Sequence, residues 1–162
     1  MPDKKAGAEE TVVVRRATPE ENDLLKQITV RSRAIWGYDA ARFRAWAERL
    51  DFSPEEWRDV EPYVAEIDGH PVGWAALKQP LNALCVLEEL WVEPESMRRG
   101  VGAQLFRFAV KRARELGAHT LEWASEPGAV GFYEKMGGRH VRDDVSGSFG
   151  HRLPVMSFDL NS

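Results

Sequence analysis

A loop between a predicted strand and a predicted helix constrains this chain more than any other feature of its sequence. The apolar run Leu84–Val92 predicts the strand, and Pro94 ends it because proline has no N–H to donate to a β-ladder. One apolar stripe predicts the helix, which stops at Gly117; its residues are Leu105, Phe106, Ala109, Val110, Ala113 and Leu116. The loop Met97-Arg98-Arg99-Gly100-Val101-Gly102-Ala103 therefore lies at a helix N-terminus, where backbone N–H groups have no helical partner.

Such a loop can hold a phosphate group. Gly100 and Gly102 allow the main chain to approach phosphate oxygens closely, and the helix dipole and two arginines add positive charge. A Gly-x-Gly alone also fits a plain tight turn. The P-loop pattern fails because Ala103-Gln104 follows the second glycine, and the dinucleotide pattern fails because Leu105 stands where a small residue is required. Nucleotide hydrolysis and nicotinamide binding are therefore disfavoured.

The rest of the chain predicts strands and helices around this unit. Before the loop we expect a strand at Thr11–Arg15, helix starts at Thr18-Pro19-Glu20-Glu21 and Ser53–Trp57, a helix at Asp39–Leu50, and a hairpin of Tyr63–Ile67 with Val72–Leu77, followed by a break at Gln79–Asn82. After the loop helix we expect strands at His119–Ala124, Arg139–Val141 and Leu153–Leu160 and a short helix at Ala129–Met136. The fold class is α/β (α+β): one mixed sheet covered by helices on both faces.

Composition narrows the class further. A chain of 162 residues with 43% hydrophobic residues fits one domain, expected over 11–162, after a loose tail at 1–10. The net charge of -4 disfavours nucleic acid as a partner, and no apolar segment is long enough to predict a membrane span or a signal peptide. Cys85 is the only cysteine, so no internal disulfide forms and a cytoplasmic location is expected.

Two motifs in order resemble the GCN5-related N-acetyltransferase (GNAT) family. Leu90–Pro94 with Arg99-Gly100-Val101-Gly102 is similar to the family's acetyl-CoA strand and loop, and Ala129–Gly137 is similar to its Ala-x-x-Phe-Tyr-Glu-Lys-x-Gly helix. The resemblance covers roughly Val86–Val141 and implies a mostly antiparallel sheet of about six to seven strands. Two positions depart from the family pattern: Met97 replaces an Arg or Gln, and Glu126 replaces an Asn that would touch the pantetheine arm.

The resemblance implies acetyl-CoA as cofactor and transfer of its acetyl group to a primary amine by direct attack in a ternary complex. The amine acceptor is a small molecule or a peptide, and a homodimer stays open. The cofactor-binding residues that it implies are Leu90, Trp91, Val92, Met97, Arg98, Arg99, Gly100, Val101, Gly102, Ala103, Ala129, Phe132 and Tyr133.

Direct attack requires a free amine, yet an alkyl ammonium has a pKa of about 10.4, so the site needs a proton acceptor. Glu88 is the candidate, because strict alternation would place it on the face of Val86, Leu90 and Val92 with Glu89 on the other face. Glu88 could instead pair with a cation of the N-terminal helices or face solvent, and a water relay could replace direct contact with the amine. The resemblance points to the Leu90 N–H for the oxyanion and to Tyr133 as proton donor to the leaving thiolate.

The acceptor is expected to enter opposite the cofactor, as in the family, between the N-terminal helices and the last hairpin. The candidate contacts are Trp36, Tyr38, Glu88, Phe149 and His151. Trp36 and Tyr38 could instead pack under the sheet, and His151 could be a solvated loop residue. The four histidines and Cys85 show no metal-ligand spacing, so no metal is expected. A non-catalytic acyl-CoA sensor of the same fold is the alternative function.

Overall fold

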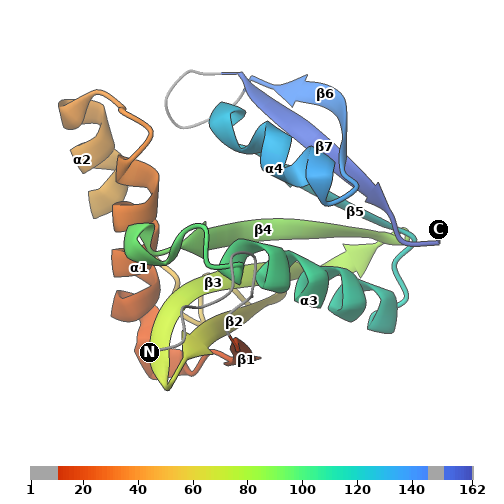
Figure 1. Ribbon diagram of the computed structural model, residues 1–162, viewed down its shortest axis with the longest axis horizontal. Coiled ribbons are helices and arrows are strands. Elements are labelled where there is room, and N and C mark those ends of the chain that lie inside the picture. The colour runs from red at the N-terminus through yellow and green to blue at the C-terminus, as the bar shows by residue number, and fades with distance from the viewer. Residues whose placement is uncertain (1–10, 146–151, 162) are drawn as a thin grey trace, which may run out of the picture.

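The computed structural model describes residues 11–145 and 152–161. Within these ranges, seven strands form one sheet and four α-helices lie against it (Figure 1). The strands are β1 (Val13–Arg16), β2 (Val60–Ile67), β3 (His70–Leu81), β4 (Leu84–Val92), β5 (Thr120–Ala124), β6 (Arg139–Asp144) and β7 (Leu153–Asp159). The helices are α1 (Asn22–Ala34), α2 (Ala40–Glu48), α3 (Val101–Glu115) and α4 (Val130–Lys135).

The strand order is β1-β2-β3-β4-β5-β7-β6, and every neighbouring pair is antiparallel except β4 and β5. This arrangement confirms the expected mixed, mostly antiparallel sheet with helices on both faces. The predicted hairpin is β2 with β3, and its turn places Asp68 and Gly69 at positive φ. The predicted start of the first helix is also present, because the Thr18 N–H donates to Glu21 Oε1 at 2.8 Å in a capping box.

Two local expectations were wrong. The segment Ser53–Trp57 forms turns instead of a helix, and the Trp57 ring packs on Trp74 of β3 with a ring-centroid distance of 5.8 Å. The break expected at Gln79–Asn82 is also absent up to Leu81, because β3 continues through Pro80 to Leu81. The pairing with β4 is irregular between Lys78 and Leu81, so no ladder hydrogen bond is required from the N–H that proline lacks.

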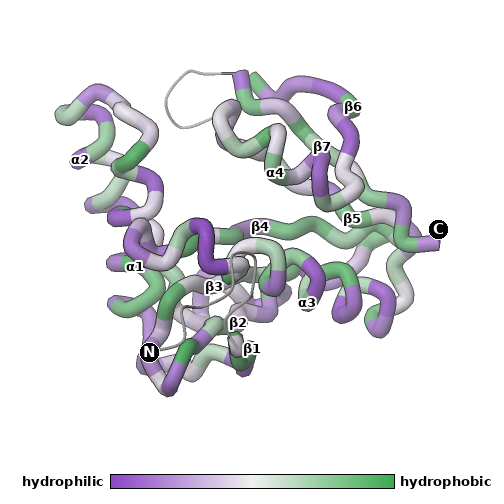
Figure 2. Tube along the Cα trace, in the orientation of Figure 1, coloured by the Kyte–Doolittle hydropathy of each residue, from purple (hydrophilic) through white to green (hydrophobic). Residues whose placement is uncertain are grey.

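The two faces of the sheet carry separate cores. On one face, α3 packs Leu105, Phe106 and Ala109 against the strands, and α4 adds Tyr133. On the other face, α1 packs Leu25 and Ile28 against strand residues of β2 and β3. Figure 2 shows β4 as a largely hydrophobic strand interrupted by a hydrophilic stretch, and the sequence of β4 has two adjacent glutamates, Glu88 and Glu89.

The parallel pair β4–β5 is short. Only Leu84, Cys85 and Val86 of β4 pair with β5, whereas the pairing of β4 with β3 continues to Val92. Figure 1 shows β4 and β5 meeting at one end and separating toward the other. The second half of β4 therefore keeps one edge without a partner strand in the described sheet.

A β-bulge interrupts β4 just where the two strands part. Leu77 pairs with Leu87 and Ala76 pairs with Glu89, so one extra residue, Glu88, is inserted in β4. Leu87 before the bulge and Leu90 after it then pack in the same core, the one covered by α3. The expectation that Glu88 shares a face with Leu90 and Val92 is wrong, because the bulge shifts the alternation by one residue.

Gly73 allows β3 to pass close to its neighbours, and we predict that Gly73→Ala destabilises the fold by about 1–3 kcal/mol. A Cβ at this position would lie 2.8 Å from the Trp91 carbonyl oxygen and 3.2 Å from Leu105 Cδ1, so backbone would have to move. Gly131→Ala is the control, because a Cβ there meets nothing within 4 Å. Urea unfolding should show the loss only for Gly73→Ala, and equal stability of the two variants would contradict this account of the packing.

Candidate active site

A cleft of about 460 Å³ opens where β4 and β5 separate. Its walls come from α1 and the residues that follow it, β4, the loop before α3 with the first turn of α3, the end of β5 with the segment after it, and α4. The residues of the second half of β4 and those of the loop face the same space as Tyr133. The lining residues are Ser32, Trp36, Leu87, Glu88, Glu89, Leu90, Trp91, Val92, Met97, Arg98, Gly100, Gly102, Ala103, Trp123, Ala124, Ser125, Glu126, Gly128, Ala129, Phe132 and Tyr133.

The loop is shaped as an anion cradle. Gly100 caps α3 in the left-handed conformation with φ 82°, and Arg98 also has positive φ, 67°. The Gln104 N–H donates to the Gly100 carbonyl, so the N–H groups that precede it in the first turn have no carbonyl partner within the helix. A Cβ on Gly102 would lie 3.4 Å from Phe132 Cζ and would narrow the space between α3 and α4. These features fit a pyrophosphate.

Most of the expected cofactor residues line this cleft, and two do not. The Val101 side chain is buried in the core, so only its main chain is available to a ligand. Arg99 lies outside the lining. Met97 both lines the cleft and packs on the core beside α3, a contact that an arginine or glutamine could not make as well.

The free edge of β4 presents the Leu90 N–H. The Glu93 N–H donates to the Val72 carbonyl of β3 at 2.8 Å, which fixes the direction of the N–H at this end of the strand. Because N–H directions alternate along a strand, the Leu90 and Val92 N–H groups point to the opposite edge, which β5 leaves open. The hydrogen-bond donor implied by the resemblance is therefore oriented toward the cleft.

Glu89 is the titratable residue that the sequence interpretation missed. Its carboxylate accepts a hydrogen bond from Trp91 Nε1 at 2.6 Å and lies in the cleft. The pKa of Glu89 is raised to about 7: burial raises it most, the Trp91 hydrogen bond opposes the rise, the charge of Glu88 adds to it, and the positive charge of Arg33 opposes it. Only the bulge places this side chain with Trp91 on the α1 side, and alternation in the sequence gave no sign of it.

Glu88 also lines the cleft, in a more exposed position than Glu89. No ion pair or hydrogen bond to its side chain is formed within the described residues, so the alternative of a structural pair with an N-terminal cation has no support there.

Tyr133 lies between the cleft and the core. Its ring is 5.0 Å from the rings of both Trp123 and Phe132 and 5.7 Å from that of Phe106. Burial raises the pKa of Tyr133 well above its usual value. The phenol is therefore held in its protonated form, which can donate a hydrogen bond into the cleft.

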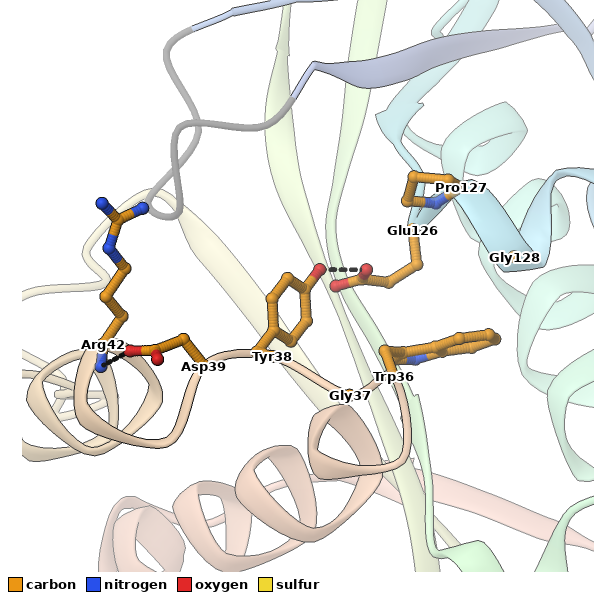
Figure 3. Close-up of a pocket in the computed structure, with 8 residues that line it drawn as sticks. All are labelled: Trp36, Gly37, Tyr38, Asp39, Arg42, Glu126, Pro127 and Gly128. Atoms are coloured by element: carbon orange, nitrogen blue, oxygen red, sulfur yellow. Dashed lines mark hydrogen bonds between the residues drawn. The ribbon is translucent and has the colours of Figure 1, made fainter.

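A second pocket, of about 580 Å³, adjoins the cleft on the side of the α1–α2 connection (Figure 3). Trp36, Glu126 and Gly128 line both spaces, and Tyr38, Asp39 and Arg42 line the second one only. Trp36 is 38% exposed, so the alternative that it packs under the sheet is wrong. Its ring lies against Gly128, where any Cβ would collide with it.

Glu126 joins two segments that are far apart in the sequence. Its carboxylate forms an ion pair with Arg33 Nε of α1 at 2.8 Å and accepts a hydrogen bond from the Tyr38 hydroxyl. Figure 3 shows the Tyr38 and Glu126 side chains pointing toward each other across the pocket. Both carboxylate oxygens are thus engaged on the α1 side, which explains how a glutamate is accommodated where the family pattern has an asparagine. Phe149 and His151, the other expected acceptor contacts, lie outside the described residues.

With this geometry in view, the chain can be placed among known proteins. The acetyltransferase (GNAT) family profile matches residues 32–138, and the chain belongs to this family. An uncharacterized N-acetyltransferase of Methanocaldococcus jannaschii is 27% identical over 139 residues, 78% of this chain. The match spans 60% of that relative's length.

Solved structures share the fold over nearly the whole chain. A GCN5-related N-acetyltransferase from Rhodopseudomonas palustris superposes with a TM-score of 0.79 at 23% identity, covering 94% of this chain and 98% of that one. The PaiA N-acetyltransferase from Thermoplasma acidophilum, solved in complex with coenzyme A, gives 0.76 at 16% identity and covers 92% and 99%. At these identities the likeness concerns the fold.

None of the helices in the described residues is long and apolar enough to cross a bilayer. Across 11–145 and 152–161, no three His, Cys, Asp or Glu side chains are grouped as a metal site would require.

The raised pKa of Glu89 predicts a pH-dependent effect of Glu89→Gln on stability. The native protein holds this proton up to pH of about 7, whereas the unfolded chain releases it near pH 4.5, so wild type loses stability relative to the variant as pH rises between these values. We expect the advantage of Glu89→Gln in unfolding free energy to grow by about 2 kcal/mol between pH 5 and pH 8. Urea unfolding across this range measures it, and a difference independent of pH would contradict the assignment.

Proposed function

We propose that this protein is an N-acetyltransferase that moves an acetyl group from acetyl-CoA to a primary amine by direct attack in a ternary complex. The observation that carries this proposal is the cleft between β4 and β5, which is lined by the anion cradle, Glu89 and Tyr133 and shares lining residues with the second pocket. A small-molecule or peptide acceptor and a cytoplasmic location remain part of the proposal.

The residues of the cradle fit the pyrophosphate of coenzyme A. Main-chain N–H groups at Gly100, Gly102 and Ala103 would hold the phosphates, with the positive charge of Arg98 beside them. The open edge of β4 and the facing side of α4, with Ala129 and Phe132, would hold the pantetheine arm. When bound, acetyl-CoA supplies the thioester carbonyl that the amine attacks.

We assign proton removal from the acceptor ammonium to Glu89. A pKa near 7 makes its carboxylate a base that is both present and effective at neutral pH. Glu88, more exposed at the same bulge, would contact the incoming ammonium and add negative charge to the site. The two glutamates thus divide the roles that sequence reasoning gave to Glu88 alone.

Leu90 and Tyr133 would act on the other side of the carbonyl. The Leu90 N–H, on the free edge of β4, would donate a hydrogen bond to the carbonyl oxygen as negative charge develops there, an effect typically worth about 3–4 kcal/mol of barrier. The Tyr133 hydroxyl would donate to the leaving sulfur. Because burial raises the pKa of Tyr133, this donation stabilises the thiolate more than it protonates it fully.

Ligand binding and turnover test the proposal separately. Acetyl-CoA should raise the thermal unfolding midpoint, because it binds the native state only, and NAD should not. Release of free thiol from acetyl-CoA across a panel of primary amines should then identify an acceptor. Absence of a shift with any CoA ester would overturn the cofactor assignment, whereas a shift without thiol release would favour the acyl-CoA sensor.

We predict that Tyr133→Phe keeps the fold and the affinity for acetyl-CoA and lowers kcat, by about 10- to 1,000-fold, since it removes only a hydroxyl. Tyr63→Phe is the matched control, because Tyr63 is a buried tyrosine of β2 whose hydroxyl donates to Glu61 at 2.6 Å, away from the cleft lining. Steady-state thiol release measures the turnover of both variants. Unchanged turnover in Tyr133→Phe would remove the tyrosine from the mechanism.

The two glutamates should differ in their pH profiles. Glu89→Gln should lower kcat/KM by about 100-fold or more. It should also abolish the acidic limb of the pH profile of kcat/KM near pH 7, because the base is gone. Glu88→Gln should keep that limb, shift it to lower pH, and raise KM for the acceptor, because Glu88 raises the pKa of Glu89. If Glu88→Gln alone abolished the limb, Glu88 would be the base.

A further inference from the structure

Arg33, near the C-terminus of α1, is a buried cation that no sequence motif singled out. Its guanidinium lies over three aromatic rings, at 4.7 Å from the centroid of Trp46, 5.2 Å from that of Tyr38 and 5.7 Å from that of Trp91. These rings belong to α2, to the α1–α2 connection and to β4. A buried charge surrounded in this way has one defined position.

The Arg33 guanidinium also holds one wall of the second pocket. It pairs with Glu126, whose other oxygen accepts the Tyr38 hydroxyl, so the start of the α4 segment and the α1–α2 connection are joined through one carboxylate. Figure 3 shows the Tyr38–Glu126 part of this link, in the pocket that Trp36 also lines. Loss of Arg33 would leave Glu126 buried with only the tyrosine as a partner.

The same cation acts on the proposed base. Arg33 favours the ionised form of Glu89, against burial and against the neighbouring charge of Glu88. The Glu89 carboxylate accepts a hydrogen bond from Trp91 Nε1, and the Trp91 ring in turn lies against the Arg33 guanidinium. One side chain therefore contacts the acceptor-side wall and influences the group that removes the acceptor's proton.

We propose that Arg33 is a positioning residue that fixes the Tyr38–Glu126 wall of the acceptor pocket and, beside the Trp91 ring that contacts both side chains, places its positive charge near Glu89. The catalytic role of Glu89 rests on the proposed function. The effect of Arg33 on the Glu89 carboxylate does not depend on it. Charge and shape contribute separately: the charge acts on Glu89, and the planar guanidinium, stacked among three rings, holds Glu126 in place.

Three variants separate these contributions. Arg33→Met removes the charge and the planar group, and Arg33→Lys keeps the charge alone. Arg31→Met is the matched control, since Arg31 lies on the same helix and pairs with Glu93 at 2.9 Å, outside both pockets. NMR titration of protein labelled with ¹³C at the glutamate carboxyls, with the Glu89 signal assigned by its loss in Glu89→Gln, reports on Glu89 without turnover.

We expect Arg33→Met to raise the pKa of Glu89 by about 0.5–1 unit, because a favourable charge is lost, and Arg33→Lys and Arg31→Met to leave it unchanged. With an acceptor from the amine panel, Arg33→Met and Arg33→Lys should both raise the acceptor KM by about tenfold without changing the KM for acetyl-CoA. The acidic limb of the pH profile of kcat/KM should move to higher pH only in Arg33→Met.

Two results would overturn the proposal: a folded Arg33→Met with the wild-type Glu89 titration, or an Arg33→Lys with the wild-type acceptor KM. If Arg33→Met does not fold, Arg33→Lys decides, because its charge is retained and only the wall is tested. Absence of thiol release in wild type would refute the proposed function, while the NMR titration would still decide whether Arg33 acts on Glu89.

Discussion

The site depends on the early end of the pairing between β4 and β5. Parallel strands in a sheet normally share hydrogen bonds along their length, yet here only Leu84–Val86 of β4 are paired with β5. The remaining half of β4 keeps a row of backbone donors and acceptors, which would be a liability at an ordinary sheet edge. Here this edge lines a cleft, where a bound ligand can use it.

The bulge at Glu88 converts this opening into a chemical site. By inserting one residue, it keeps Leu90 and Val92 in the core beside α3 and sends Glu89 and Trp91 to the side of α1. A carboxylate in that position is costly, since burial disfavours its charge, and the raised pKa of Glu89 expresses this cost. The same cost is what makes the group a proton acceptor at neutral pH.

Distant segments complete the acceptor side. Arg33 comes from α1, Tyr38 from the connection to α2, and Glu126 from the segment between β5 and α4, and only their meeting forms a wall. The departure of Glu126 from the family pattern thereby gains a physical reason. Gly128 belongs to the same arrangement, because a side chain there would displace Trp36.

The sequence by itself determined the fold class, the bounds of β4, and the placement of the glycine loop at the start of α3, because these follow from local periodicity, Pro94 and the two glycines. It also placed Tyr133 on a short helix after β5. Only the tertiary structure decided which glutamate is the less exposed one beside Trp91, because a bulge is set by the pairing partner of a strand and leaves no trace in the strand's own alternation. The contacts of Arg33 likewise join residues up to 93 positions apart, so they depend on how the α1–α2 segment packs on the sheet rather than on any local pattern.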